Sequence, residues 1–357
     1  MKDSYLTAGI TISQLFRLLN RNKVAFNPKT LLRLAFLFQG ACWSSLFSMI
    51  EKARFAEALN KLKVPEDPVF IIGHWRTGST YLHQALSLDL HFHAPTLFEV
   101  AVPDSFLVSY PFYRPLFKRL IGKHRPMDLV EIGMDEPQED EYAIYRTTSF
   151  SPLEQLVFQS SEKYFLDDEM PFLPPSADLE QWKNELRHFY RKLHFKSGKR
   201  IISKNPFNSF RINTLLEIFP KAKFIHITRH PFNVVPSTIN MWKILGKQNT
   251  LTNHATNPTV DEVARFLGKL LNVVEKAKSD LPAGTIAEIR FEDLEKDPVT
   301  VITNLYKQLN LPFSVGFEEK IRDFKKKTNH YQKNNFTLKD EEKRLIREEL
   351  SIYFAPT

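Results

Sequence analysis

Cysteine is almost absent from this chain, because Cys42 is the single cysteine among 357 residues. One cysteine cannot form an intrachain disulfide, and it cannot supply a zinc cluster that is built from several thiolates. The composition therefore excludes these two ways of stabilising a fold, and it favours a reducing setting such as the cytoplasm.

A secretory signal is not expected either, because the first twenty residues have no sustained apolar run with a small-residue cleavage site. The run Leu34–Ile50 carries no charge and lies between Arg33 and Glu51. It is just short of the usual spanning length and contains a glutamine, a glycine and three serines. Three interpretations stay open: a buried helix, a helix lying on a membrane surface, and a true span. Basic residues near the run favour the membrane surface: Arg17, Arg21, Lys23, Lys29 and Arg33.

Phenylalanine, in contrast, is abundant, with 30 residues in a chain that is 43% hydrophobic. A Phe-rich core accounts for this, and an apolar ligand channel or a lipid-facing surface is the alternative. The net charge of +8 favours anionic partners such as phosphates or acidic membrane surfaces. Acidic and basic residues are mostly interspersed, so nucleic acid is not expected as a partner.

Short apolar segments alternate with helical ones, which predicts an α/β fold with a mainly parallel central sheet. The expected architecture is a P-loop-like, three-layer fold: residues 1–67 form an N-terminal helical extension that could meet a membrane, and residues 68–357 form the main domain. Ligands should bind beyond the carboxyl ends of the strands. The predicted strands are Val69–Ile72, Arg200–Ser203, Lys223–Thr228 and Thr285–Glu292. The predicted helices include Ser79–Leu90, Pro206–Phe219 and Val260–Asp280.

The stretch GHWRTGST follows the first predicted strand. Gly73 and Gly78 permit tight backbone geometry, and Ser79 and Thr80 open the next helix, so backbone N–H groups and a positive helix end face an anion. A nucleoside triphosphatase would carry GxxxxGK[ST], with a lysine directly before the hydroxyl residue. Here the cation is Arg76, inside the loop. The loop therefore predicts a phosphate site without the usual contacts to a terminal phosphate and magnesium.

A second anion site is predicted from KFIHITRHPFNVVPST. Arg229 ends a predicted strand, and Ser237 lies eight residues later on the next helix. A guanidinium and a hydroxyl in this arrangement can hold one more phosphate. Two phosphate sites on separate strand–helix units imply a ligand that is phosphorylated in two separate places, which ATP is not.

Together these two motifs resemble those of sulfotransferases that use 3′-phosphoadenosine 5′-phosphosulfate (PAPS). The resemblance runs from about Pro68 to about Pro298, includes RFEDLEKDP, and leaves the N-terminal helices unexplained. The loop arginine and the sequence KNPF are similar to tyrosylprotein and bacterial sulfotransferases, and RPMDLVEIGMDEPQEDEYA is similar to bacterial enzymes that modify membrane lipids and glycans. The resemblance implies that the first motif holds the 5′-phosphosulfate and the second holds the 3′-phosphate. The donor-binding residues that it implies are Arg76, Thr77, Gly78, Ser79, Thr80, Tyr81, Arg229 and Ser237.

Sulfuryl transfer needs an in-line acceptor hydroxyl, a base for its proton, and cations for the transferring group and the departing phosphate. The sulfuryl group carries less negative charge than a phosphoryl group, so fixed arginine and lysine can suffice and no metal is expected. Arg76 is the first predicted cation. Lys204 in ISKNPF is the second, and it matches the catalytic lysine of the tyrosylprotein enzymes.

The base is open between three residues. Cytosolic sulfotransferases place a histidine two residues after the corresponding lysine, but here that position is Pro206. The tyrosylprotein enzymes use a glutamate about twenty residues beyond the loop, which favours Glu99. Glu136 in DEPQEDE is the second candidate, and His93 is the third.

Two more segments could touch the donor. Tyr81 lies where relatives place an aromatic ring against adenine, and simple packing is the alternative. The basic segment Lys325–Lys333 could close over the 3′-phosphate, or it could be a solvated surface.

The sequence is thus interpreted as a nucleotide-binding transferase of the cytoplasm, at or near the inner face of the membrane. A lipid or lipid-linked alcohol is the first choice of acceptor, and a sugar hydroxyl is the second. The alternatives are a P-loop kinase of a small molecule, which predicts magnesium and ATP, and a non-catalytic nucleotide-binding membrane adaptor.

Overall fold

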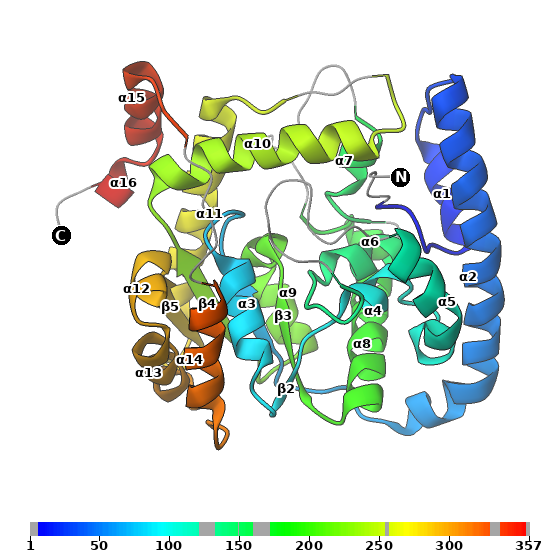
Figure 1. Cartoon of the computed structure of the whole chain (residues 1–357), viewed down its shortest axis with the longest axis horizontal. Helices are drawn as coiled ribbons and strands as arrows, with labels where there is room; N and C mark the ends of the chain where they lie inside the picture. The colour runs from blue at the N-terminus through cyan, green and yellow to red at the C-terminus, as the bar shows by residue number, and fades with distance from the viewer. Residues whose placement is uncertain are drawn as a thin grey trace.

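A parallel sheet of five strands lies at the centre of the computed structural model, which describes residues 6–120, 133–148, 150–159, 172–253, 257–328 and 336–354 (Figure 1). The strand order is β2-β3-β1-β4-β5. The strands are β1 (Val69–Ile72), β2 (Phe92–His93), β3 (Arg200–Lys204), β4 (Lys223–Thr228) and β5 (Ile286–Arg290). All neighbouring strands pair in parallel, and Ile71 of β1 lies opposite Lys204 on one side and Ile225 on the other. The predicted α/β fold is confirmed.

The side chains of β1 alternate between two hydrophobic clusters, one on each face of the sheet. Phe70 and Ile72 belong to the first cluster, and Val69 and Ile71 belong to the second. The first cluster includes residues of helices α8 (Ser176–Ser197), α9 (Ile212–Ile218), α10 (Pro231–Asn249) and α11 (Val260–Asp280). The second includes residues of α3 (Ser79–Ser87), α12 (Phe291–Lys296), α13 (Pro298–Gln308) and α14 (Phe317–Thr328). A sheet with helices on both faces is the three-layer arrangement that was predicted.

Several shorter or peripheral helices complete the described part of the chain. They are α4 (Leu97–Ala101), α5 (Phe106–Leu120), α6 (Glu141–Thr148), α7 (Glu154–Val157), the 3-10 helix η1 (Pro206–Phe210), α15 (Asp340–Glu349) and α16 (Ser351–Phe354). Helices α15 and α16 lie near α10 and α11, on the side of the molecule opposite to α1 and α2 (Figure 1).

The N-terminal residues form α1 (Ile12–Arg21) and α2 (Pro28–Lys61), which run along one side of the molecule (Figure 1). The Asn27 side chain caps α2 by accepting from the Thr30 amide, and Pro28 occupies the first turn, where its missing N–H costs nothing. Leu18 of α1 and Leu37 of α2 are buried in the first hydrophobic cluster. By length and apolarity α2 could cross a membrane, although a third (33%) of its apolar window is buried in the protein. The division into residues 1–67 and 68–357 stays a prediction.

Some elements differ in detail from the predictions, and α3 ends at Ser87 instead of Leu90. The predicted helix Pro206–Phe219 is two elements, η1 and α9, which meet at Arg211. The Arg211 side chain is buried and paired with Glu141, so this corner is held by an ion pair. Strand β5 ends at Arg290 because α12 begins at Phe291, and the two-residue strand β2 was not predicted.

Candidate active site

The segment between β1 and α3 is a tight loop whose shape depends on glycine. Gly73 and Gly78 have positive φ angles of 131° and 90°. A Cβ atom on Gly78 would lie 2.0 Å from the ring of Phe291, and a Cβ atom on Gly73 would lie 2.5 Å from the carbonyl oxygen of Ile227. The loop can therefore keep this conformation only with glycine at both positions.

Contacts within the loop and with neighbouring elements hold the loop in place. Thr77 donates from its hydroxyl to the His74 carbonyl over 2.7 Å. The Trp75 ring packs edge-on against Trp242 of α10 and Phe207 of η1, with centroids 5.0 and 4.9 Å apart. Ser79 and Thr80 form the first turn of α3, and the residue before them, Gly78, offers no side-chain cap. Their backbone N–H groups are therefore open to an anion.

The two predicted phosphate motifs meet in the folded chain. Arg76 donates from Nε to the Ser237 hydroxyl over 2.8 Å, and Arg229 donates from Nη1 to the Arg76 carbonyl over 3.1 Å. The Arg229 guanidinium also lies 4.8 Å from the centroid of Phe291, the ring that closes over Gly78. Arg76 has a φ of 67°, a left-handed conformation that an arginine seldom adopts. Such backbone outliers cluster at functional sites, and this one orients a cation.

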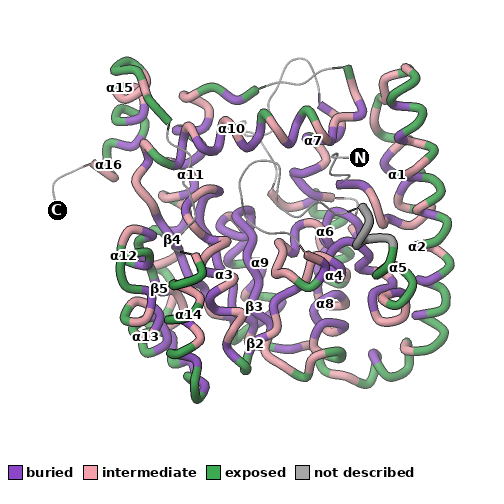
Figure 2. The backbone as a smooth tube through the Cα atoms, in the orientation of Figure 1, coloured by how far each residue is buried: buried purple, intermediate pink, exposed green. Residues whose placement is uncertain are grey.

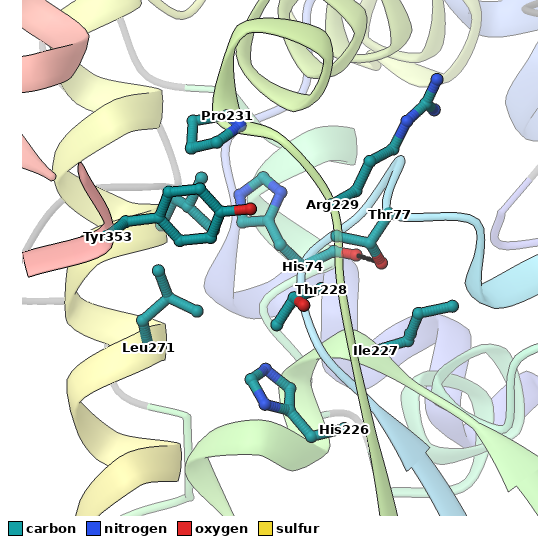
Figure 3. A pocket seen from close by; sticks show the side chains of 10 residues that line it. His74, Thr77, His226, Ile227, Thr228, Arg229, Pro231, Leu271 and Tyr353 are labelled. Atoms are coloured by element: carbon teal, nitrogen blue, oxygen red, sulfur yellow. Dashed lines mark hydrogen bonds between the residues drawn. The ribbon is translucent and has the colours of Figure 1, made fainter. Parts of the chain in front are cut away.

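A narrow cavity lies beside the loop, and its lining includes Thr77 and Arg229 (Figure 3). His74, His226 and Tyr353 line it, and Arg229 points away from Tyr353 (Figure 3). Burial lowers the pKa of His74 to about 4, so its ring is neutral at pH 7. The cavity has room for about one water molecule, which is too little for a nucleotide.

Lys204 ends β3, next to β1 and the loop, and it forms an ion pair with Glu139. The pair is largely shielded from solvent, with side-chain exposures of 5% and 13%. Glu139 was not singled out from the sequence, although it lies in the acidic run DEPQEDE that supplied Glu136. A single sequence contains no signal for its pairing with Lys204, which lies 65 positions away.

A buried polar network holds the Glu139 segment against the end of β3. Asp140 accepts from the Tyr190 hydroxyl over 2.5 Å and from the Asn205 side chain over 2.8 Å. Asn205 also donates to Glu141, which pairs with Arg211. Burial raises the pKa of Asp140 to about 6, and the hydrogen bond from Tyr190 opposes this rise. The residues on either side of Lys204 and Glu139 are thus fixed to one another.

Glu99, the first choice of base from the sequence, lies in a different environment. Its side chain is fully buried and contacts Lys196 at 2.7 Å and His93 at 3.0 Å. It also accepts from the Thr96 amide in a capping box at the start of α4. Burial alone would raise the pKa of Glu99, but the hydrogen bond from His93 and the charge of Lys196 hold the pKa at about 2. A carboxylate with this pKa is a weak proton acceptor at neutral pH.

The structure also shows the surroundings of other residues that were predicted from the sequence. His93 is engaged with Glu99, and the backbone carbonyl of Glu136 accepts from the Leu97 amide over 2.9 Å. The Tyr81 ring packs against Phe324 of α14, with centroids 4.9 Å apart. Of the predicted late basic segment, residues 325–328 belong to α14, and 329–333 lie outside the described residues.

Comparison with known proteins adds an independent observation. A profile described as "Sulfotransferase family" matches residues 68–315, which is most of the chain. The chain is 31% identical over 349 residues to proteins of Mycobacterium bovis and Mycobacterium tuberculosis named omega-hydroxy-beta-dihydromenaquinone-9 sulfotransferase Stf3. The match covers 96% of this chain and 88% of each relative.

Two solved structures share the fold. Sulfotransferase STF9 from Mycobacterium avium has a TM-score of 0.68 at 17% identity, and the match covers 99% of this chain and 91% of that one. Sulfotransferase STF1 from Mycobacterium tuberculosis has a TM-score of 0.60 at 18% identity, covering 95% and 91%.

Proposed function

The chain belongs to the sulfotransferase family, and we propose that it moves the sulfuryl group of PAPS to the hydroxyl of a lipid-like alcohol. One observation carries the choice of donor: the loop cation Arg76 contacts both Ser237 and Arg229 of the second motif. Two groups of anion-binding side chains on separate strand–helix units, joined in this way, fit a nucleotide with phosphates on both sides of its ribose.

Each donor-binding residue has a proposed task. The open N–H groups at Ser79 and Thr80 bind the 5′-phosphosulfate together with Arg76 and the backbone of Thr77 and Gly78. Arg229 and Ser237 bind the 3′-phosphate. This requires Ser237 to share its hydroxyl between Arg76 and the ligand, which a hydroxyl can do because it donates once and accepts twice. Tyr81 lies beside Phe324 and Phe291, an aromatic group that suits contact with adenine.

The Lys204–Glu139 pair supports an assignment of the reacting groups. The acceptor oxygen attacks sulfur, its proton passes to the Glu139 carboxylate, and the sulfur–oxygen bond to the 5′-phosphate breaks with its electron pair left on that phosphate. Lys204 and Arg76 offset the charge that develops on the bridging oxygen. These residues supply an acid–base group and two fixed cations, so the proposed transfer uses no metal.

Glu99 remains the base that the sequence predicts, but Glu139 is better suited. Glu139 lies beside the cation that the reaction needs, and it retains some exposure to solvent. Glu99 has its oxygens engaged by Thr96, His93 and Lys196. The proposed role of Glu99 is therefore to fix α4 and His93.

The proposed acceptor class rests on the relatives and on composition. The names of the relatives given above include a menaquinone derivative that has a hydroxyl group. They align with 96% of this chain, so a long apolar alcohol is the acceptor class that we propose here. A lipid acceptor also fits the proposed location, in the cytoplasm at the inner face of the membrane.

Purified full-length protein incubated with 35S-labelled PAPS and a total lipid extract tests this function. We expect label in an organic-soluble product, and we expect the yield to be unchanged by EDTA. Transfer from γ-labelled ATP in place of PAPS would support the kinase alternative instead. In a parallel incubation, a sugar replaces the lipid extract as acceptor. If the label moves to the sugar but not to the lipid, PAPS is still the donor and the proposed acceptor class is wrong.

A further inference from the structure

Large apolar side chains are exposed on the outward sides of α1, α2 and α5, and the proposed transfer site does not use them. We propose that this surface, called the outer face, lies in the plane of an anionic lipid bilayer and docks the enzyme there. Its members are large apolar side chains that remain exposed in the folded protein. They are Phe16, Leu31, Leu32, Phe38, Trp43, Leu46, Met49, Ile50 and Phe112.

The sequence of α2 places these side chains on one side of the helix. Exposed uncharged residues recur every three or four positions, which is the spacing of one helix face. They are Leu31, Ala35, Phe38, Cys42, Leu46 and Met49. The apolar stripe extends over about 30 Å, since each residue of a helix adds about 1.5 Å. Figure 2 shows α1 and α2 at the edge of the molecule, with exposed residues along both.

Aromatic contacts join the three helices into one continuous surface. Phe16 of α1 meets Phe38 of α2 edge-on, with ring centroids 6.4 Å apart. Phe47 of α2 lies 6.3 Å from the Trp43 ring and 4.9 Å from the Phe112 ring of α5. Phe112 is 67% exposed, so the surface continues onto α5. Large apolar side chains that are exposed together on one side of a protein mark an interaction site.

The charges around the outer face indicate which partner binds there. Residues 6–61 contain eight lysines and arginines and two acidic residues, of which Glu51 is buried and Glu57 pairs with Lys61 at the end of α2. Exposed cations lie at both ends of the apolar stripe: Arg17, Arg21, Lys23 and Lys29 at one end, and Lys52 and Arg54 at the other. An anionic bilayer offers apolar chains to the stripe and phosphate groups to these cations. A second copy of the chain would instead bring like charges together.

The opposite side of α2 shows that the helix lies along the bilayer and does not cross it. Arg33 donates to the Thr250 carbonyl over 2.8 Å, which ties the start of α2 to the end of α10. Glu51 pairs with buried Lys192 of α8 and accepts from the Leu107 amide of α5 over 2.7 Å. A spanning helix would leave these groups without partners in hydrocarbon, which is costly. Only the outward side of α2 is available to lipid.

The outer face is also connected to the reacting pair. Glu139 lies two residues before the start of α6, and Arg146 of α6 donates to the Ala8 carbonyl, just before α1, over 2.7 Å. The bilayer would therefore lie one layer of helices away from Glu139 and Lys204. This link rests on the proposed lipid-like acceptor, but docking itself does not depend on the acceptor or on catalysis.

Trp43 provides a direct readout of docking. It is 48% exposed, whereas Trp75, Trp182 and Trp242 are at most 4% exposed. Full-length protein is mixed with phosphatidylcholine vesicles with or without phosphatidylglycerol, some made with brominated acyl chains. We expect co-flotation with the anionic vesicles, loss of binding at high salt, and quenching of tryptophan emission by bromine near the headgroups. Trp43→Phe should still float but lose the quenching.

Two charge-introducing variants test the assignment of the face. Leu46→Glu should weaken vesicle binding about tenfold, because a half-exposed leucine would otherwise enter the lipid. Val315→Glu is the matched control, since Val315 is 97% exposed but lies far along the chain from the outer face. It should bind vesicles as the parent does. Both variants should keep the parent's melting temperature and its affinity for adenosine 3′,5′-bisphosphate, which shows that they are folded.

Four results would overturn the proposal. The first is no flotation with anionic vesicles, and the second is equal loss of binding in Leu46→Glu and Val315→Glu. The third is retention in membranes after an alkaline carbonate wash, which indicates a span. The fourth is a dimer in sedimentation that Leu46→Glu dissociates, which assigns the face to a second copy. None of these results affects nucleotide binding, so a failure here is distinguishable from a failure of the proposed function.

Discussion

Arg76 donates from Nε to the hydroxyl of Ser237 over 2.8 Å, across 161 positions of sequence. Arg76 belongs to the loop after β1, and Ser237 lies on the helix after β4. The two strands are neighbours in the sheet, so their carboxyl ends bring both motifs to one edge. This contact makes a single nucleotide site out of two separate sequence motifs.

Replacing Arg229 tests the second motif. Arg229→Ala should weaken binding of adenosine 3′,5′-bisphosphate by about tenfold to a hundredfold, the usual value of a charge-assisted phosphate contact. ATP, which has no 3′-phosphate, should lose much less, and calorimetric titration of both nucleotides measures the difference. Equal losses for the two nucleotides would mean that Arg229 shapes the loop, through its bond to the Arg76 carbonyl, rather than binding the 3′-phosphate.

Replacing the two glutamates separates the candidate bases. Glu139→Gln should lower turnover by about a hundredfold or more while donor affinity is kept, because the amide cannot take the acceptor proton. Glu99→Gln should retain much more of the turnover, and Glu136→Gln is the matched control within the same acidic run. If Glu99→Gln, still folded, loses turnover and Glu139→Gln keeps it, the base is Glu99 as the sequence predicts.

Glu99 should instead stabilise the folded chain at neutral pH and lose this effect in acid. Its pKa is lowered from 4.5 to about 2 in the folded chain, so the folded state is favoured above pH 4.5, and this contribution is lost as the pH falls toward 2. The shift corresponds to about 3 kcal/mol at neutral pH. Urea unfolding at pH 7 and at pH 3 should therefore show a large deficit for Glu99→Gln at pH 7 and a smaller one at pH 3. Other groups that titrate in this range, such as Asp140, are present in both proteins, so their contributions cancel in the difference between parent and variant.

The same difference between parent and variant at both pH values would contradict this role. It would show that Glu99 acts through shape and hydrogen bonding, with no net stabilisation from its charge.

Gly78 offers a test of the loop conformation. Gly78→Ala should unfold at a lower temperature and lose donor binding, because the new Cβ would collide with Phe291 at a φ of 90°. Gly198→Ala is the matched control, since Gly198 also has a positive φ, 64°, but no atom lies within 4 Å of its added Cβ. The control should cost about 1 kcal/mol of stability and leave donor binding intact. Equal effects in both variants would mean that the contact with Phe291 is unimportant.

Much of the fold could be predicted from local patterns. The segment Val69–Ile72 is apolar at every position because both faces of β1 are covered, and the sequence shows this directly. The helix Val260–Asp280 was predicted from its apolar spacing and is confirmed with the same bounds. Strand β2 has only two residues, Phe92 and His93, so it has no periodicity to detect. The break at Arg211 depends on its long-range partner Glu141, which local reasoning cannot supply.

Part of the candidate site was likewise predictable from local motifs, and part of it depends on tertiary contacts. Arg76, Arg229 and Ser237 were predicted because each lies just after a strand, in a loop or first helical turns with a recognisable motif. Glu99 was chosen by its distance along the chain from the loop, and that distance does not report which cation a carboxylate meets in the fold. Lys204 meets Glu139, and Glu99 meets Lys196. Only the tertiary structure pairs these charges.

Calorimetric titration of the folded protein with adenosine 3′,5′-bisphosphate tests the central claim most directly. Adenosine 5′-monophosphate and ATP serve as the comparison ligands, in buffer without divalent metal. We expect saturable binding of the bisphosphate, at least about tenfold tighter than either comparison ligand, because Arg229 and Ser237 recognise the 3′-phosphate. No binding of the bisphosphate, or tighter binding of ATP, would contradict the account.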